Sequence, residues 1–170
     1  MRHVFRLSGL VMLLAVMVTA VAGAQQTVFV VRHAERADGG TTGATMGNTD
    51  PELSDAGKAR AQSLATVLKD SGIKAIYVTE FKRTQQTAAP LASALGIQPT
   101  VVPSKDMAGL MEKLKAGSGN ALVVGHSNTV PDVIRQLGVA EPVKLSDADY
   151  DWLFLVTQAS QASLVRLHFR

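Results

Sequence analysis

Four residues have the chemistry needed to bind and transfer a phosphoryl group, and each stands close behind an apolar, strand-like run of the sequence. They are Arg32, His33, Arg83 and His126. Phosphoryl transfer requires an in-line nucleophile and fixed positive charge around the three non-bridging oxygens. An imidazole can be the nucleophile, and a guanidinium group binds phosphate oxygens through paired, charge-assisted hydrogen bonds. These residues therefore predict a phosphate site with a histidine nucleophile.

The order of the four residues suggests a role for each. His33 follows Arg32 directly, and arginine charge beside an imidazole lowers the pKa of the ring, which keeps it unprotonated and able to attack. Arg83 lies at the start of an expected helix, where backbone N–H groups and the helix dipole also favour an anion. His126 opens another expected helix, and we expect it to act as a cationic donor to phosphate.

The residue that protonates the leaving group is left open by the sequence. Three acidic residues are candidates for this general acid: Glu35, Glu80 and Asp106. Asp106 lies where a loop enters an expected helix, so a role as a helix cap is the better interpretation. Further substrate contacts are expected from three residues next to the histidines: Arg36, Ser127 and Asn128. For Arg36, a salt bridge with Asp38 in a solvated loop is the slightly better interpretation.

The scaffold must bring these distant residues together. Short β-branched runs alternate with amphipathic stretches, which is typical of an α/β fold with a mainly parallel sheet. Strands are expected at residues 27–31, 75–79, 99–102 and 121–124. Helices are expected from a cap at Ser54 to the stop at Gly72, and over residues 82–95, 106–115 and 128–137. The last two strands, 152–157 and 163–169, fit an antiparallel hairpin at the sheet edge. The predicted fold has three layers, with helices on both faces of the sheet.

In such a sheet, ligands bind beyond the carboxyl ends of the strands. The segments that follow residues 27–31, 75–79 and 121–124 should therefore converge at one edge. The long irregular stretch 37–53 also follows a strand directly. Loops of this length in compact domains are usually functional or disordered.

The first 24 residues differ in composition from the rest of the chain. Two arginines precede an apolar, uncharged run at residues 7–21, and residues 22–24 are the small residues that a signal peptidase accepts. We expect residues 1–24 to be a cleaved secretory signal and residues 25–170 to form one domain of an exported protein, periplasmic or secreted. A retained membrane anchor is the alternative, which the short apolar run argues against.

Composition also limits the partners. Residues 1–24 hold two of the 17 Lys+Arg and none of the 14 Asp+Glu, so residues 25–170 carry a net charge of +1. A domain so close to neutral gives no reason to expect nucleic acid or, after signal cleavage, stable membrane association. No cysteine is present, and the histidines lack the spacing of a metal site, so no disulfide, metal or cofactor is expected. The expected partner is a small phosphorylated substrate, and the oligomeric state is left open.

Three motifs give the chain a resemblance to the histidine phosphatase superfamily, also called phosphoglycerate mutase-like. Residues 30–35 (VVRHAE) resemble its Arg-His-Gly-Glu motif with Ala for Gly, residues 82–88 (KRTQQTA) resemble its Arg-Ala-x-Gln-Thr-Ala helix start, and residues 123–127 (VVGHS) resemble its second histidine turn. The resemblance implies that His33 is phosphorylated. It further implies phosphate ligands at Arg32, Arg83 and His126. The compact length resembles the phosphohistidine phosphatases within that superfamily, and the substrate class stays open.

Two alternatives use the same residues differently. Residues 125–129 approach the G-x-S-x-G nucleophile elbow, with Ser127 as the nucleophile and Asp149 and His168 downstream in triad order. Thr129 replaces the last glycine, and the chain is short for a serine hydrolase of that kind. A non-catalytic module that binds a phosphate or phosphosugar would keep the arginines, but two histidines beside them favour turnover.

Overall fold

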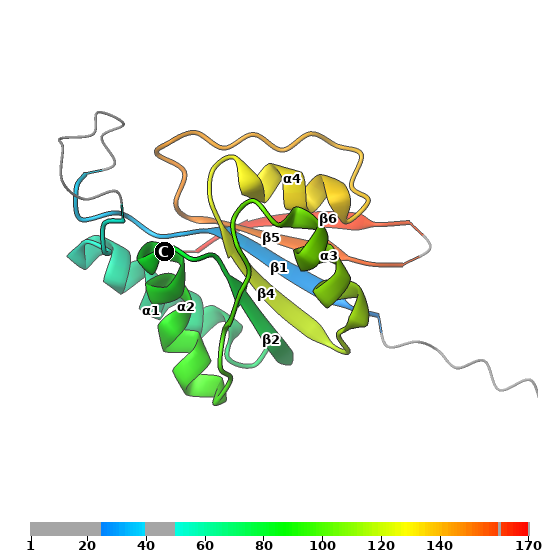
Figure 1. The fold of residues 1–170 in the computed structure, drawn as a ribbon, viewed down its shortest axis with the longest axis horizontal. Helices are drawn as coiled ribbons and strands as arrows, with labels where there is room; N and C mark the ends of the chain where they lie inside the picture. Colours follow the sequence, from blue (N-terminus) through cyan, green and yellow to red (C-terminus); the bar gives the residue numbers. More distant parts are fainter. Residues whose placement is uncertain (1–24, 40–49, 160, 170) are drawn as a thin grey trace, which may run out of the picture.

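A computed structural model describes residues 25–39, 50–159 and 161–169. Their core is a single six-stranded sheet with the strand order β3-β2-β4-β1-β5-β6 (Figure 1). In chain order the strands are β1 (Thr27–Arg32), β2 (Ile73–Val78), β3 (Thr100–Val101), β4 (Asn120–Gly125), β5 (Trp152–Thr157) and β6 (Ser163–His168). The predicted strands are all present.

The pairing of the strands confirms the predicted sheet. β1 and β2 each pair in parallel with β4, and β3 pairs in parallel with β2. β5 runs antiparallel to β1, and β6 runs antiparallel to β5 to close the sheet with an edge hairpin. β3 is only two residues long, shorter than predicted, because Pro99 and Pro103 flank it and cannot donate ladder hydrogen bonds.

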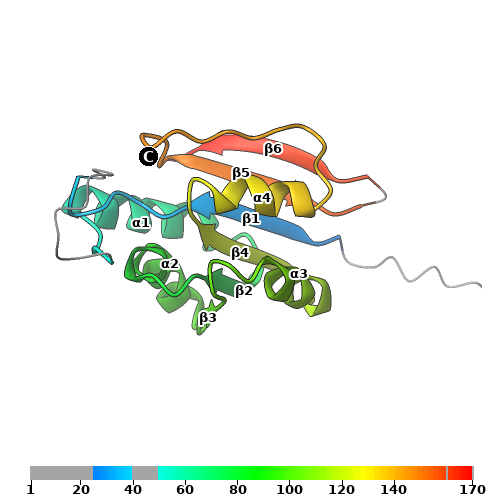
Figure 2. The ribbon, with the colours of Figure 1, turned by 45° about the horizontal axis from the view of Figure 1, so that its top comes forward.

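Four helices cover the two faces of the sheet (Figure 2). They are α1 (Asp55–Leu68), α2 (Lys82–Leu95), α3 (Met107–Ala116) and α4 (Thr129–Gln136). α1 and α2 pack on one face and α3 and α4 on the other. β1 alternates between them, since Val28 and Val30 join the α3/α4 side and Phe29 and Val31 the α1/α2 side. The three-layer prediction is thereby confirmed.

Local sequence signals explain where the helices begin and end. The Ser54 side chain caps α1 by accepting from the backbone N–H of Gly57, and the Asp106 side chain caps α3 by accepting from Gly109. α2 continues through Pro90 and ends at Gly96, which adopts φ 64°. The interpretation of Asp106 as a cap is confirmed.

Two sequence predictions lie outside the described residues. The proposed signal, residues 1–24, is one of them, and most of the long stretch 37–53 is the other, since residues 40–49 are not described. Within the described part of the chain, no helix combines the length and apolarity needed to cross a membrane.

Candidate active site

Strand register brings the two histidines together at the carboxyl ends of β1 and β4. Arg32 lies beside Gly125 across the parallel ladder, and the His33 backbone N–H donates to the Gly125 carbonyl at 2.9 Å. The rings of His33 and His126 are consequently only 5.3 Å apart between centroids, at an interplanar angle of 63°. The ends of these two strands therefore converge at one edge of the sheet, as expected.

His33 is buried and held in one tautomer. Its Nδ1 lies 2.8 Å from the Ala34 carbonyl oxygen, which can only accept, so Nδ1 carries the proton and Nε2 keeps its lone pair. Burial lowers the pKa of His33 from 6.5 to about 3; the bond to Ala34 opposes the shift, and the charges of His126, Arg32 and Arg83 add to it. The ring is therefore neutral at physiological pH, with a nucleophilic nitrogen available.

His126 is also buried, and its partners define its proton. Arg83 can only donate, so its Nη2 donates to His126 Nδ1 at 3.4 Å, and Nε2 then carries the proton and donates to Thr79 Oγ1 at 3.0 Å. Burial first and the Arg83 charge second lower the pKa of His126 to about 4. Without phosphate, His126 is therefore neutral, because a buried imidazole beside a guanidinium loses its proton readily, and its expected role as a cationic donor to phosphate stays a prediction.

Arg32 is fixed by the irregular segment between α4 and β5. Its Nη1 donates to the Ser146 carbonyl at 2.9 Å, and its guanidinium lies 4.2 Å from the ring centroid of Tyr150. Asp147 is near its Nη2, at 3.8 Å. The guanidinium is thus oriented by groups on its outer side, while Nε is buried without a hydrogen-bond partner in the described structure.

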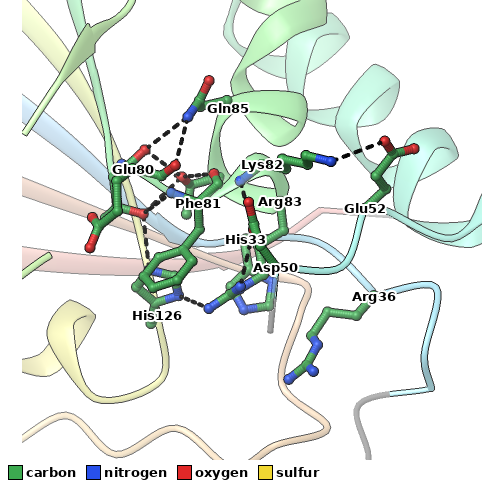
Figure 3. Close-up of polar contacts among 12 residues, drawn as sticks. His33, Arg36, Asp50, Glu52, Glu80, Phe81, Lys82, Arg83, Gln85 and His126 are labelled. Atoms are coloured by element: carbon green, nitrogen blue, oxygen red, sulfur yellow. Dashed lines mark hydrogen bonds and ion pairs between the residues drawn. The ribbon is translucent and has the colours of Figure 1, made fainter. Parts of the chain in front are cut away.

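Arg83 and Arg36 approach the histidines from two other elements. Arg83 lies at the start of α2, 4.3 Å from the Phe81 ring centroid and 3.7 Å from Asp50, and Figure 3 draws its guanidinium next to the His126 ring. Arg36 follows β1 and pairs with Asp38, as the sequence suggested. Both have a buried Nε with no partner among the described residues. Because buried donors are rarely left unpaired, three such donors at one place indicate an anion site.

These side chains surround one open pocket of about 380 Å³. Its lining includes all four residues of the predicted phosphate site, together with Arg36, Ser127 and Asn128. The sequence analysis did not single out two further lining residues, Ser104 and Lys105, which come from the loop between β3 and α3. The predicted substrate contacts therefore lie at the same place as the predicted catalytic residues.

The candidate general acids are not part of this pocket. Glu35 forms a bidentate salt bridge with Arg60 of α1, with Nε–O distances of 2.8 and 2.9 Å. Asp106 is occupied as the cap of α3. Burial would raise the pKa of Glu80, but hydrogen bonds from backbone N–H groups and the Ser104 hydroxyl outweigh it and lower the pKa. Glu35 and Asp106 are therefore held by other partners, while Glu80 interacts with His126 and with Ser104 of the pocket lining, and the choice of general acid stays a prediction.

Other contacts hold the His33 loop in position. Thr87 of α2 accepts the Ala34 N–H at 2.9 Å. On the other side, a Cβ built on Gly57 would lie 2.2 Å from the Glu35 carbonyl oxygen, so α1 can approach this closely only with glycine. The bidentate pair of Glu35 with Arg60 adds a third anchor. His33, the predicted nucleophile, therefore lies on a loop that is held between α1 and α2.

Sequence reasoning missed three aromatic and hydroxyl side chains of the site. Thr79 binds the second histidine, Phe81 stacks under Arg83, and Tyr150 lies under Arg32. Thr79 and Phe81 could have been found from their place just behind a strand. Tyr150 follows a segment without periodicity, so no sequence pattern places it beside Arg32.

The serine hydrolase alternative is not supported by the geometry. Ser127 lies in the pocket, but His168 is on the edge strand β6, 3.0 Å from Asp151, and Asp149 accepts from the backbone N–H of Ser146. The triad is not assembled. No group of three or more His, Cys, Asp or Glu side chains suited to a metal ion occurs within residues 25–39, 50–159 and 161–169.

Known proteins match the chain both by family and by sequence. The family model for the histidine phosphatase superfamily (branch 1) matches residues 28–114, just over half of the chain. A PE-PGRS family protein of Mycobacterium tuberculosis, PE_PGRS11, is 43% identical over 67 residues, which are 38% of this chain and 12% of that protein. The chain therefore matches only a small part of that relative's length.

Solved structures share the fold. The protein histidine phosphatase SixA complexed with tungstate superimposes with a TM-score of 0.66 at 20% identity, over 84% of this chain and 96% of that chain. A mycobacterial glucosyl-3-phosphoglycerate phosphatase complexed with VO3 gives a TM-score of 0.67 at 13% identity, over 84% and 98%. At these identities the likeness establishes a common fold.

Proposed function

The chain belongs to the histidine phosphatase superfamily, and from this premise we propose that it hydrolyses a phosphomonoester or phosphohistidine through a phosphohistidine formed on His33. The observation that carries the proposal is the state of His33. Its ring is neutral, its Nδ1–H donates to the Ala34 carbonyl, and the lone pair on Nε2 is available to attack phosphorus. A structural histidine would need neither this tautomer nor three arginines with unpaired donors around it.

In the proposed reaction, Nε2 of His33 attacks phosphorus while the bond from phosphorus to the leaving oxygen or nitrogen breaks. Guanidinium groups of Arg32, Arg83 and Arg36 hold the non-bridging oxygens. Phosphorylation places positive charge on the imidazole, and the Nδ1–H bond to the Ala34 carbonyl is strengthened by that charge. The leaving group takes up one proton from solvent. Water then attacks phosphorus and gives up one proton to solvent, the P–N bond breaks with its electron pair returning to Nε2 of His33, and inorganic phosphate is released.

The protonation state of His126 would change during this cycle. Its pKa is about 4 beside Arg83, and a phosphate dianion in the pocket would oppose the arginine charge and raise that pKa. His126 could then donate to phosphate in its cationic form. The expectation of a cationic donor therefore becomes a proposal about the substrate complex.

The proposed substrate class rests on protonation of the leaving group, since no described carboxyl is assigned as the general acid. Arg60 and the α3 backbone hold Glu35 and Asp106, and Ser104 holds Glu80, so aryl oxygens and imidazole, which need little protonation, should leave faster than alkyl oxygens. The fold relatives bind tungstate and VO3, oxyanions that resemble phosphate, and one is named a protein histidine phosphatase.

We further propose export of the protein, on the composition of residues 1–24 alone.

A rapid-quench labelling experiment tests the proposal. The protein is mixed with a phosphate ester carrying labelled phosphorus and stopped within milliseconds, and we expect acid-labile, base-stable label on the wild type and none on His33→Asn. Ser127→Ala is the matched control, because Ser127 lines the same pocket and should leave labelling intact. Label lost in Ser127→Ala but kept in His33→Asn would indicate a serine nucleophile. Binding without label or turnover in any variant would indicate a phosphate-binding module.

A further inference from the structure

Each arginine of the pocket lies beside one aspartate. The pairs are Arg32 with Asp147 at 3.8 Å, Arg36 with Asp38, and Arg83 with Asp50 at 3.7 Å. The three aspartates come from two separate irregular segments, the stretch after β1 and the segment between α4 and β5. Only Asp147 lines the pocket itself, whereas Asp38 and Asp50 lie beside its arginines. We call Asp38, Asp50 and Asp147 the three pocket aspartates because each pairs with a pocket arginine.

Positive and negative charges occupy different depths of this site. The Arg32 side chain is 7% exposed, whereas that of Asp147 is 70% exposed, and the other two pairs follow the same order. Each arginine also has a buried Nε without a hydrogen-bond partner in the described structure. At least one N–H donor of each arginine is therefore not engaged by its aspartate. A phosphate would therefore bind at the arginines, and the rest of the substrate would extend past Asp147, the one aspartate in the described lining.

The charge balance is unusual for a site that takes a dianion. The described lining carries four cations, the three arginines and Lys105, and one carboxylate, Asp147. Asp38 and Asp50 lie outside the lining but pair with two of these arginines, so the three carboxylates together leave one net positive charge. A bound phosphate dianion then adds more negative charge than Lys105 can offset. A second anionic group on the substrate would meet repulsion, whereas a positive group would meet attraction.

We propose that the three pocket aspartates select phosphomonoesters whose organic group is neutral or cationic, and discriminate against esters that carry a further carboxylate or phosphate. This inference rests on the proposed phosphatase function and adds a charge criterion for its substrate. Asp147 is the specificity-determining residue that can be tested by itself, because it lines the pocket and is the most exposed of the three. Its contact with Arg32 at 3.8 Å is also too long to be the main anchor of that arginine, which the Ser146 carbonyl holds at 2.9 Å.

The test compares three alkyl phosphates of similar size: O-phosphocholine with a fixed positive charge, glycerol 1-phosphate with none, and 3-phosphoglycerate with an added carboxylate. One unit charge at about 6 Å in a water-exposed setting changes relative rates by about three- to tenfold. In Asp147→Asn, we expect kcat/KM for 3-phosphoglycerate to rise by that factor relative to glycerol 1-phosphate, and kcat/KM for O-phosphocholine to fall by it. Lys105→Met should change both ratios in the opposite direction.

Asp55→Asn is the matched control, because it removes the same charge from a fully exposed side chain on α1, which does not line the pocket. Turnover of an aryl phosphate is measured for all variants, because it tests the proposed function independently of the charge criterion. Aryl phosphate turnover with unchanged ratios in Asp147→Asn would overturn the charge criterion alone. An equal loss for all three alkyl phosphates, with the aryl phosphate unaffected, would also overturn it and indicate a general acid at Asp147. No turnover of any ester by the wild type would overturn both.

Discussion

Replacing His33 with asparagine should change how the stability of the protein depends on pH, and the size of that change follows from the structure. The folded protein keeps His33 neutral down to a pKa of about 3, whereas the unfolded chain titrates at the ordinary value of 6.5. As the pH falls through 6.5, the unfolded chain takes up a proton that the folded protein does not accept. Wild-type stability therefore falls with pH in this window, and the contribution levels off only below the folded pKa.

The magnitude is insensitive to the exact folded pKa. Between pH 7 and pH 5, a histidine with an unfolded pKa of 6.5 and a much lower folded pKa makes the free energy of unfolding fall by about 2 kcal/mol. A folded pKa of 4 instead of 3 changes this figure by less than about 0.1 kcal/mol. His33→Asn removes the titrating group, so its free energy of unfolding should fall by about 2 kcal/mol less than that of the wild type over the same interval.

Urea unfolding of both proteins at pH 7 and pH 5 measures the difference. Leu91→Ala is the control, because Leu91 is a fully buried residue of α2 that does not titrate, and its substitution should lower stability equally at the two pH values. An unfolding free energy that falls equally in wild type and His33→Asn would refute the reasoning. It would mean that the folded protein accepts the proton at His33 as readily as the unfolded chain does.

Four more outcomes follow from the site. Arg83→Ala should lower kcat/KM for an aryl phosphate by about two to three decades, as expected when one preorganised charge donor is lost, and steady-state kinetics on the folded variant checks this. Gly57→Ala should lower the free energy of unfolding by about 1–3 kcal/mol and also reduce kcat, because its Cβ would collide with the Glu35 carbonyl; thermal unfolding and kinetics measure the two effects. Thr79→Val should cost about 1–3 kcal/mol in urea unfolding, since the His126 Nε2–H loses its buried acceptor. Aryl phosphatase activity should persist in EDTA and be inhibited by vanadate, and a complete loss restored by zinc or magnesium would contradict the nucleophile assigned here.

The sequence predicted the sheet well because the parallel strands are buried on both faces and are therefore continuous apolar runs. β1 and β4 are each five-sixths buried, and their apolar runs were located to within a residue or two. The bounds of α2 agree with the prediction because a glycine ends it and amphipathic spacing runs along it. β2 begins two residues earlier than predicted, at Ile73, where the ladder with β4 has a register irregularity that local sequence does not encode.

The proximity of the proposed catalytic residues was predictable for a different reason. Arg32 ends β1, and His33 and His126 directly follow β1 and β4. Arg83 begins the helix that follows β2, so the topology of the sheet brings all four to one edge. Their protonation states were not predictable, because the pKa of His126 depends on burial and on which donor reaches Nδ1. The salt bridge of Glu35 with Arg60 was not predictable either. Arg60 is 25 residues away, on a helix whose approach to the loop depends on the close packing at Gly57.

The segment between α4 and β5 illustrates what sequence patterns leave out. It has no helix or strand, yet it supplies a backbone carbonyl, an aromatic ring and a carboxylate to one arginine, through Ser146, Tyr150 and Asp147. The carbonyl contact is independent of residue type, so no motif could encode it. Arg32 directly precedes His33, the proposed nucleophile, and a segment that fixes this guanidinium would also fix the direction from which phosphate meets Nε2 of His33. Two segments more than 100 residues apart thus set one geometry, in which the loop after β1 carries the proposed nucleophile and the segment before β5 orients the charge proposed to hold phosphate.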